Sequence, residues 1–536
     1  MPTITIDDRC VEVPAGSTVL DAARKLGIDI PTLCFLDGFK ASTSCQVCLV
    51  KMLDTGRYAP SCGTQVVDGM RVASETPEVH GMRRTALELI FSDHVGDCLA
   101  PCFFACPAHM DVPHMLRQIG AEDLHGAIAT IKEDIALPAV LGRVCPKPCE
   151  KGCRRSGADG PVEVCDLKRY VADRDLASRE PYIPACLPDT GKRVAVIGAG
   201  PTGLAAAFHL RSQGHAVTIY DAQSQPGGRL RHEFAEDVLP RTTLDGEIDV
   251  ILRTGIELRT DSRIGADIPF QDLVDQVDAV LVACGADDAQ AAKDWGLQVG
   301  SRGINVKART FETSLSGVFA AGNATRGKGM VVRSVADGKE AAAVIGRYLS
   351  SGVVTPTARP FSSRIGKVQG GEMSEFLAGA AAGPRRDEID FNLDVFSTHD
   401  AAQQADRCLA CGCAAHGNCR LERYAAMYEV DATKYQDGPR AVVQINRGGS
   451  VLYEPGKCIN CEICIQIASE SRSALGLSFV GRGFDVRVGV PFNGTMEEAL
   501  GDLAAKCIAM CPTGALYNAP MHSLVQLEPL GSLSEK

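Results

Sequence analysis

The chain has 536 residues, of which 45% are hydrophobic and 23% charged, and its net charge is -11 from 55 Lys and Arg against 66 Asp and Glu. This length exceeds what one core organises, so several folded domains are expected. The acidic balance without a basic run excludes nonspecific nucleic-acid binding. No apolar run of about 18 residues and no basic-then-apolar leader occurs, which favours a cytoplasmic protein without a membrane span.

Cysteine content is the most informative part of the composition. The 23 cysteines fall mainly in four groups, at 34–62, 98–165, 408–419 and 458–511. A disulfide scaffold does not persist in a reducing compartment, so metal or cluster ligation is the expected role of these groups. Four further cysteines are expected to pack in the fold without ligating: Cys10, Cys186, Cys284 and Cys507.

Local patterns divide the chain into structural segments. Apolar residues alternate from Ile4 to Val13, and the capped segment STVLDAARKLGI follows, so residues 1–80 are expected to form a β-grasp unit. Helical apolar spacing, broken by Cys-Pro pairs, marks residues 81–187 as a helical domain. A strand, a glycine-rich turn and a helix open residues 188–350, as in a doubly wound α/β domain.

The first cysteine group is Cys34, Cys45, Cys48 and Cys62. Its spacing lets three thiolates converge while a distant fourth closes the site, as in a 2Fe-2S cluster. Zinc also takes four thiolates, but its usual spacing is two close pairs. The spacing resembles the N-terminal domain of the large iron-sulfur subunit of respiratory complex I and related hydrogenase diaphorase subunits, which implies a 2Fe-2S ferredoxin domain.

The second group supplies the eight ligands that two 4Fe-4S clusters require: His94, Cys98, Cys102, Cys106, Cys145, Cys149, Cys153 and Cys165. The motifs ACPAHMDVP and GRVCPKPCEKGC resemble the helical domain of the glutamate synthase small subunit and dihydropyrimidine dehydrogenase. The resemblance implies two ligand groups, which are Cys98, Cys102 and Cys153, and Cys106, Cys145 and Cys149.

Two ligands of this second group are less directly supported. Lys168 stands where a carboxylate or amide can ligate in that family, so Cys165 is expected to substitute for it. His94 lies in SDHVGDC, which resembles the His-ligand motif of the complex I subunit. A lone His is more often a hydrogen-bonded surface or core residue than a ligand, and both alternatives stay open.

The third group, Cys408, Cys411, Cys413 and Cys419, supplies four thiolates within about twelve residues, enough for one metal centre. Zinc is an alternative to a 4Fe-4S cluster here, and His416 could replace one of the cysteines. The following segment RLERYAAMYEV resembles the one after the histidine-ligated cluster of complex I, which favours the iron-sulfur cluster.

The last group contains the motifs CINCEIC and CPTGAL. In two-cluster ferredoxins the fourth ligand of the first cluster comes from the later Cys-Pro motif. Ala468 replaces a cysteine that a second cluster would need, so one 4Fe-4S cluster is expected on Cys458, Cys461, Cys464 and Cys511. The segments SFVGRGFDVRVGVPF and CPTGAL resemble the ferredoxin-like part of the complex I large subunit, over residues 450–520.

A dinucleotide fingerprint opens the α/β domain. Gly198, Gly200 and Gly203 permit a tight turn, close pyrophosphate approach and close helix packing, and Asp221 ends the next strand, where it can bind a ribose hydroxyl. The segments PGGRL and GVFAAGNATRG resemble FAD contacts of the glutamate synthase small subunit family, with Asn323 in place of its Asp. The resemblance implies FAD at Gly198, Gly200, Pro201, Thr202, Gly203, Asp221, Ala222, Gly228, Arg229, Gly322 and Asn323.

A second nucleotide-binding unit is not expected in this chain. In that family an NADPH-binding Rossmann unit separates the two segments that correspond to ACG and GVFAAGN. Here they are only about thirty residues apart and contain no second fingerprint, and a βαβ unit needs about that length by itself. A degenerate Rossmann fold without flavin is the alternative for the whole domain.

Together these patterns predict a flavin and iron-sulfur electron-transfer subunit of a multi-subunit NAD(P)-linked oxidoreductase of hydrogenase, formate dehydrogenase or electron-bifurcating type. It would relay electrons between an NAD(P)H-oxidising flavoprotein partner and a further redox subunit or ferredoxin. The expected cofactors are FAD, one 2Fe-2S cluster and about four 4Fe-4S clusters, and no residue is expected to be catalytic. The alternatives are an autonomous FAD reductase that acts on a small substrate with ferredoxin as donor, and a non-catalytic cluster scaffold or redox sensor.

The expected architecture is therefore multidomain α/β and α+β. Its parts are a β-grasp 2Fe-2S ferredoxin domain (1–80), a helical domain with two 4Fe-4S clusters (81–187), a Rossmann-like FAD domain (188–350), a linker arm (351–400), a Cys-rich cluster segment (401–446), a ferredoxin-like 4Fe-4S domain (447–520) and a tail (521–536).

Overall fold

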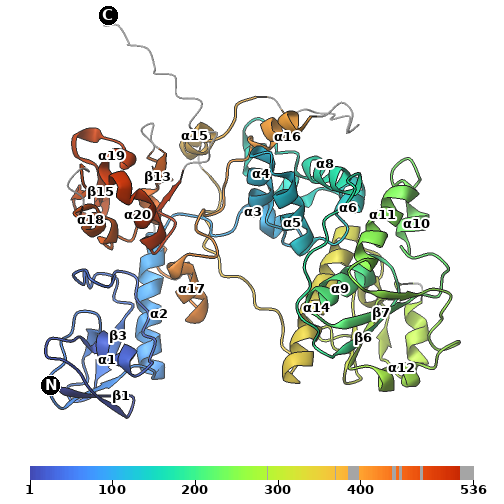
Figure 1. Ribbon diagram of the computed structural model, residues 1–536, viewed down its shortest axis with the longest axis horizontal. Helices are drawn as coiled ribbons and strands as arrows, with labels where there is room; N and C mark the ends of the chain where they lie inside the picture. The colour runs from blue at the N-terminus through green and yellow to red at the C-terminus, as the bar shows by residue number, and fades with distance from the viewer. Residues whose placement is uncertain are drawn as a thin grey trace, which may run out of the picture. The chain divides into compact units, whose positions relative to one another are not determined.

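The computed structural model describes residues 1–286, 288–368, 370–383, 385, 397–436, 442–445, 450–470 and 475–518. Its contacts divide the chain into two interleaved units, coloured along the chain in Figure 1. Unit 1 comprises Met1–Ala100, Pro360–Ala380 and Ala410–Lys536, and unit 2 comprises Pro101–Arg359 and Ala381–Leu409. The expected tail at 521–536 lies outside the described residues. Within the described part of the chain, no helix is long and apolar enough to cross a membrane.

Unit 1 begins with a mixed five-stranded sheet in the order β2-β1-β5-β3-β4. Strand β1 pairs antiparallel with β2 and parallel with β5, so Ile4 and Ile6 of β1 are fully buried. Helix α1 (Val19–Lys25) begins at Thr18, whose side chain forms a capping box with Asp21. The strands are β1 (Thr3–Ile6), β2 (Arg9–Glu12), β3 (Leu49–Met52), β4 (Tyr58–Pro60) and β5 (Met70–Ala73).

Helix α2 (Pro77–Ser92) follows the sheet and belongs to unit 1. Its Leu87 and Phe91 are buried in one core with residues from the C-terminal part of the chain, including Leu421 and Leu516. The boundary between the units therefore falls after Ala100, whereas the sequence pattern suggested a helical domain from residue 81. The helical spacing from residue 81 does belong to a helix, α2, but the apolar face of that helix packs within unit 1.

In its described residues, the C-terminal part of unit 1 contains two small antiparallel strand pairs and short helices. Strand β13 (Val451–Tyr453) pairs with β16 (Leu516–Asn518), and β14 (Ser478–Val480) pairs with β15 (Arg487–Gly489). The helices include α17 (Arg420–Met427), α18 (Ile463–Ala468), α19 (Met496–Leu500) and α20 (Ala504–Met510). Helix α15 (Gly370–Ala378) lies within the expected linker arm, and its Phe376 is buried.

Unit 2 opens with short helices around one apolar core. Prolines occupy the first turns of α4, α6 and α7, where a missing N–H costs nothing. The helices of this part are α3 (Pro101–Ala105), α4 (Val112–Gly120), α5 (Leu124–Asp134), α6 (Pro138–Val144), α7 (Pro148–Lys151), η1 (Arg154–Gly157), α8 (Val164–Leu176) and α16 (Thr398–Ala405).

The rest of unit 2 is a parallel sheet in the order β12-β9-β6-β7-β8, with helices α9 (Pro201–Ser212) and α14 (Val331–Ser351) packed together. The chain leaves β6 towards β7 and later returns to its other side as β9, which creates the switch point where such folds bind ligands. The strands are β6 (Arg193–Ile197), β7 (Ala216–Tyr220), β8 (Glu257–Arg259), β9 (Ala279–Val282) and β12 (Val318–Ala320).

Smaller elements complete this domain. Along the chain, helices α10 (Leu230–Glu233) and α11 (Arg241–Leu252) connect β7 to β8, and α12 (Phe270–Gln276) connects β8 to β9. Helix α13 (Asn323–Arg326) follows β12. Among the described residues between β9 and β12, the chain forms η2 (Ala289–Lys293) and the short pair β10 (Val299–Gly300) and β11 (Gly303–Ile304).

Candidate cofactor sites

The glycine fingerprint forms a tight turn between β6 and α9. Gly198 has a φ of +106°, and its N–H donates to the carbonyl oxygen of Tyr220 at 2.7 Å. A Cβ on Gly203 would lie 1.9 Å from the carbonyl oxygen of Gly198, so this position must be glycine for the helix to approach the strand. A Cβ on Gly200 would meet no atom within 4 Å, because this residue borders open space.

A cavity of about 930 Å³ lies at this switch point. Nine of the residues predicted for FAD line it: Gly198, Gly200, Pro201, Thr202, Asp221, Ala222, Gly228, Arg229 and Asn323. The other two predicted residues, Gly203 and Gly322, do not line the cavity. A Cβ on Gly322 would lie 2.2 Å from Oγ1 of Thr202, so the lack of a side chain at Gly322 allows its backbone to pack closely against Thr202 of the cavity wall.

Asp221 is held at the edge of the cavity by two main-chain donors. Its Oδ2 accepts from the N–H of Ala199 at 2.6 Å and its Oδ1 from the N–H of Gln223 at 2.8 Å. Each carboxylate oxygen keeps a second lone pair, which a ribose hydroxyl can use. The glycine turn, the open space at Gly200 and this carboxylate fit a flavin dinucleotide, with its pyrophosphate at the start of α9.

Much of the cavity wall was missed by the sequence analysis, including two aromatic rings and a cysteine. The rings of Phe270 and Trp295 stack with their centroids 5.1 Å apart and their planes 7° apart, and both line the cavity. Cys284, which was expected only to pack, also lines it, and burial raises the pKa of its thiol to about 12. Trp295 is the single tryptophan of the chain, but no spacing rule connects it with Phe270.

The four cysteines of the first group gather beside the N-terminal sheet, and we call them the N-terminal site (Cys34, Cys45, Cys48 and Cys62). The main-chain N–H of Cys45 donates to the sulfur of Cys34 at 3.5 Å, and the sulfurs of Cys48 and Cys62 are 3.4 Å apart. Hydrogen bonds from neighbouring thiols lower the pKa of Cys34 to about 2 and that of Cys48 to about 7, and raise the pKa of the other two. The four thiols therefore lie close to one another, as the ligands of a shared group do.

The four cysteines expected in the last group also come together, as the C-terminal site (Cys458, Cys461, Cys464 and Cys511). All four line one small cavity, with Tyr453, Val488 and Leu516 among its apolar walls. Cys507 does not line this cavity, and its sulfur contacts the carbonyl oxygen of Cys464 at 3.9 Å. Burial raises the pKa of Cys507 to about 11, as for an ordinary packed thiol.

Cys98 lies with two cysteines of the third group in unit 1, and we call these three the boundary site (Cys98, Cys413 and Cys419). The main-chain N–H of Cys413 donates to the carbonyl oxygen of Cys98 at 3.2 Å. Burial raises the pKa of Cys98 to about 11 and of Cys419 to about 12, and the neighbouring thiols of the site add to both shifts. The resemblance grouped Cys98 with Cys102 and Cys153, which belong to unit 2.

His94 is close to this part of unit 1. Its Nδ1 is buried without a hydrogen-bond partner among the described residues, and burial lowers its pKa to about 3, with a further contribution from Lys457. A neutral imidazole with a free nitrogen is the form that binds metals. The other candidate, His416, contacts Oε1 of Glu422 through Nδ1 at 2.9 Å.

The predicted third group is divided between the units. Cys408 packs against the core of unit 2, while Cys411, Cys413 and Cys419 belong to unit 1. The chain passes from one unit to the other directly after Leu409, in the middle of the motif. The short spacing that suggested one self-contained centre therefore spans a boundary between two folded units.

Four cysteines of unit 2 form a further group, the helical site (Cys106, Cys145, Cys149 and Cys165). Hydrogen bonds from the thiols of Cys145 and Cys149 lower the pKa of Cys165, which in turn raises theirs. Cys106 acts electrostatically on Cys149, and Cys106, Cys149 and Cys165 are buried in one core. Nearby, a Cβ on Gly152 would lie 2.7 Å from the Cβ of Ala105, so the segments that carry Cys102 and Cys153 pack closely.

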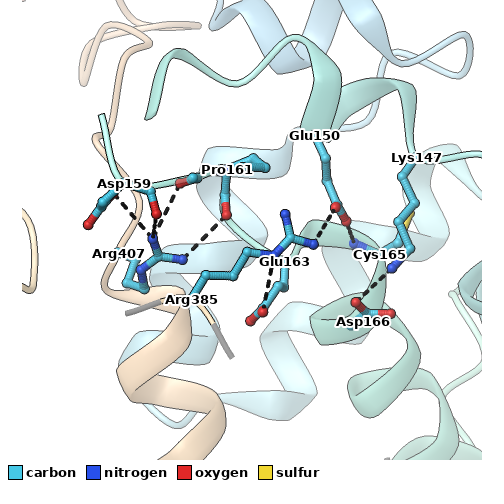
Figure 2. A network of polar contacts seen from close by, with 10 residues as sticks. Lys147, Glu150, Asp159, Pro161, Glu163, Cys165, Asp166, Arg385 and Arg407 are labelled. Carbon is cyan, nitrogen blue, oxygen red and sulfur yellow. Dashed lines mark hydrogen bonds and ion pairs between the residues drawn. The ribbon is translucent and has the colours of Figure 1, made fainter. Parts of the chain in front are cut away.

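A polar network fixes the loop between α7 and α8, which connects Cys149 and Cys165 of the helical site, as Figure 2 shows. Oε1 of Glu150 accepts from the main-chain N–H of Cys165 at 3.0 Å, which holds the start of α8. Arg385 lies between Glu150 and Glu163, at 3.5 Å and 3.4 Å. Arg407 donates to the carbonyl oxygen of Pro161 and to Asp159, both at 3.3 Å. Residues of the segment before the third cysteine group thus secure this loop.

Among the residues that the structure describes, no three or more His, Cys, Asp or Glu side chains gather tightly enough to hold a single metal ion.

Three protein-family models match the chain. The 2Fe-2S iron-sulfur cluster binding domain matches residues 1–77, the 4Fe-4S cluster domain II of dihydropyrimidine dehydrogenase matches residues 94–180, and the pyridine nucleotide-disulphide oxidoreductase domain matches residues 154–338. These matches cover the N-terminal site, the helical site and the glycine fingerprint.

Curated relatives match about a third of the chain. The beta subunit of the NADP(+)-dependent formate dehydrogenase of Moorella thermoacetica is 36% identical over 207 residues, which are 35% of this chain and 29% of that protein. The PreT homolog of the NAD-dependent dihydropyrimidine dehydrogenase of Salmonella typhi is 40% identical over 195 residues, 35% of this chain and 47% of that protein. The beta subunit of the NADPH-Fe(3+) oxidoreductase of Geobacter sulfurreducens is 38% identical over 189 residues, 35% of this chain and 28% of that protein.

The chain thus spans less than half the length of these relatives. Among solved structures, an NAD+-reducing [NiFe]-hydrogenase is 33% identical over 17% of this chain and 39% of its own, with a TM-score of 0.17. The family matches define a multidomain oxidoreductase with 2Fe-2S, 4Fe-4S and FAD-type redox domains. Its cofactors are accordingly FAD and iron-sulfur clusters.

Proposed function

We propose that this chain is the flavin and iron-sulfur electron-transfer subunit of a multi-subunit NAD(P)-linked oxidoreductase. It would carry electrons between an NAD(P)H-oxidising flavoprotein partner and a further redox subunit or ferredoxin. When bound, FAD exchanges electrons in pairs or singly and the clusters exchange them singly, while the protein holds these groups and tunes them. The named relatives are subunits of a formate dehydrogenase, a dihydropyrimidine dehydrogenase and an NADPH-Fe(3+) oxidoreductase. These names support an electron-transfer subunit of an NAD(P)-linked complex.

One observation carries this proposal, namely that two cysteine sites share a single core in unit 1. Cys34 and Cys45 of the N-terminal site and Cys461 of the C-terminal site are buried in the same apolar cluster. Cys34 is close enough to Cys461 to raise its pKa electrostatically, in addition to the larger effect of burial. Clusters held at such neighbouring sites would exchange electrons with each other, which a storage or purely structural role does not require.

We further propose the ligands of each centre. The N-terminal site would hold a 2Fe-2S cluster, and the C-terminal and helical sites would each hold a 4Fe-4S cluster. The boundary site would hold another 4Fe-4S cluster with His94 as its fourth ligand, in line with the resemblance to the complex I large subunit. The remaining cysteines of unit 2 with suitable motifs, Cys102, Cys153 and Cys408, would serve a further cluster.

The direct test is anaerobic reduction of the purified full-length chain, followed by absorbance of the flavin and the clusters. Dithionite is expected to bleach both in the isolated chain, whereas NADH or NADPH is expected to bleach them only when the co-purified partner subunits are present. Bleaching of the isolated chain by NADH or NADPH would contradict the proposed relay and would favour an autonomous reductase.

A further inference from the structure

Lys168 is a buried cation next to the helical site. It lies on α8, three residues after Cys165 and therefore on the same face of the helix, and its side chain is only 3% exposed. Electrostatic interactions connect it with all four cysteines of that site, and they raise the pKa of its ammonium although burial acts against this. A lysine side chain is positively charged at its ordinary pKa, so a buried cation lies within one helical turn of Cys165.

Among the described residues, no ion pair or hydrogen bond joins Lys168 to an acidic side chain, and the three nearby acids are engaged elsewhere. Glu150 binds the main-chain N–H of Cys165 and Arg385, and Glu163 pairs with Arg385. Asp166 pairs with Lys147 at 2.7 Å.

A buried charge without a partner is strongly unfavourable, so the site must contain a compensating negative charge when the protein is in its working state. Four thiolates around a 4Fe-4S core carry a net negative charge, and reduction makes that charge one unit more negative. A fixed cation beside the cluster stabilises the reduced state more than the oxidised state, because the attraction grows with the charge.

We propose that the Lys168 ammonium is the counter-ion of the iron-sulfur cluster at the helical site and raises the reduction potential of that cluster. This inference rests on the proposed function, since it requires a cluster at Cys106, Cys145, Cys149 and Cys165. In the step concerned, one electron from a mediator enters the cluster, and Lys168 neither forms a bond nor transfers a proton. Lys168 is thus a positioning residue that acts through charge.

A second buried lysine offers a matched comparison. Lys457 precedes Cys458 of the C-terminal site and is 7% exposed, but it forms an ion pair with Glu454, which is equally buried. Because this pair is neutral overall, replacement of Lys457 and Glu454 together removes no net charge. Among the residues that the structure describes, Lys168 has no such partner, so its replacement changes the net charge around the helical site by one unit.

The experiment is a potentiometric titration of the full-length protein, monitored by electron paramagnetic resonance, with iron content determined for each sample. The variant Cys165→Ser first identifies the signal of the helical site by its loss or change. Wild type is then compared with Lys168→Met and Lys168→Leu, which remove the charge, with Lys168→Arg, which keeps it, and with the double variant Lys457→Met with Glu454→Gln.

We expect the neutral variants to lower the ratio of reduced to oxidised cluster at a fixed potential by about tenfold or more, equivalent to about 59 mV per tenfold for one electron. Lys168→Arg should keep the wild-type midpoint, and the double variant should leave this signal unchanged. Loss of iron in both neutral variants but not in Lys168→Arg would also support a counter-ion. An unchanged midpoint with iron retained, or loss of iron in all three variants, would overturn the inference. If Cys165→Ser alters neither iron nor signals, the proposed cluster itself fails.

Discussion

The main-chain N–H of Cys413 donates to the carbonyl oxygen of Cys98 at 3.2 Å, and a parallel bridge joins the adjacent residues Asp97 and Gly412. These residues stand on either side of the chain segments that form unit 2. Their pairing joins the first and last segments of unit 1, while Pro360–Ala380 of unit 1 lies in the chain between the two segments of unit 2. The boundary site therefore combines Cys98 from the first segment with Cys413 and Cys419 from the last.

This pairing predicts that Cys98 and Cys413 serve the same centre. Cys98→Ser and Cys413→Ser should each remove or alter one and the same paramagnetic signal, because each would lose a ligand of one cluster. The measurement is electron paramagnetic resonance of the reduced protein with iron analysis. If Cys98→Ser instead shares its lost signal with Cys153→Ser, the grouping implied by the resemblance to glutamate synthase is correct.

The C-terminal site predicts a contrast between two cysteines that are close in sequence. Cys511→Ser should lower the iron content by about four atoms per chain, because Cys511 lines the cavity with the other three thiols. Cys507→Ser is the matched control and should keep all the iron, since Cys507 lies outside that cavity. Equal losses in the two variants would show that Cys507 also ligates.

The glycine cradle predicts a variant that folds but binds flavin poorly. Gly200→Val meets no protein atom at its Cβ, so the fold should persist, but the added side chain enters the space at the start of α9. We expect a loss of flavin affinity of about tenfold or more, or at least about 1.4 kcal/mol.

Flavin released by acid, measured per chain, checks this expectation. Gly246→Ala on α11 is the control, because its Cβ would only touch Leu176 at 3.8 Å. Wild-type flavin content in Gly200→Val would contradict the placement of the pyrophosphate at this turn.

Glu247 of α11 predicts a pH-dependent contribution to stability. Its carboxylate oxygens accept from the main-chain N–H groups of Ala139 and Val140, each at 2.7 Å, at the start of α6. Burial raises its pKa to about 7 from the ordinary value of 4.5, although the two donors act in the opposite direction. Between these values the folded protein holds a proton that the unfolded chain has released, so the stability contributed by Glu247 falls as the pH rises.

Glu247→Gln should destabilise the protein by about 1–3 kcal/mol, because an amide offers one acceptor for two buried donors. The loss of stability relative to wild type should be largest at about pH 5 and should become smaller towards about pH 8. Thermal unfolding at both values is the measurement. Asp245→Asn, an exposed position on the same helix, should change stability little at either pH, and a difference for Glu247→Gln that grows with pH would contradict the assignment.

The local elements were largely predictable because short-range chemistry specifies them. The alternation from Ile4, the capping of α1 by Thr18 and Asp21, and the glycine turn before α9 all appear where the sequence indicates. The four cysteines of the N-terminal site and the four of the C-terminal site also gather as their spacing suggests. In each of these cases the deciding contacts lie within one short motif or within one recognised domain pattern.

By itself, then, the sequence determined which residue types are available for flavin and cluster binding and which local turns and helices carry them. Only the tertiary structure decided that α2 packs against the C-terminal part of the chain and that the backbones of Cys98 and Cys413 form a hydrogen bond. It also decided that Cys408 packs against the core of unit 2. It decided as well that Lys168 is buried with no acidic partner in the part of the chain that the structure describes. Such arrangements depend on which apolar faces from distant parts of the chain pack together. The spacing of residues along the chain does not specify which of these faces will pair.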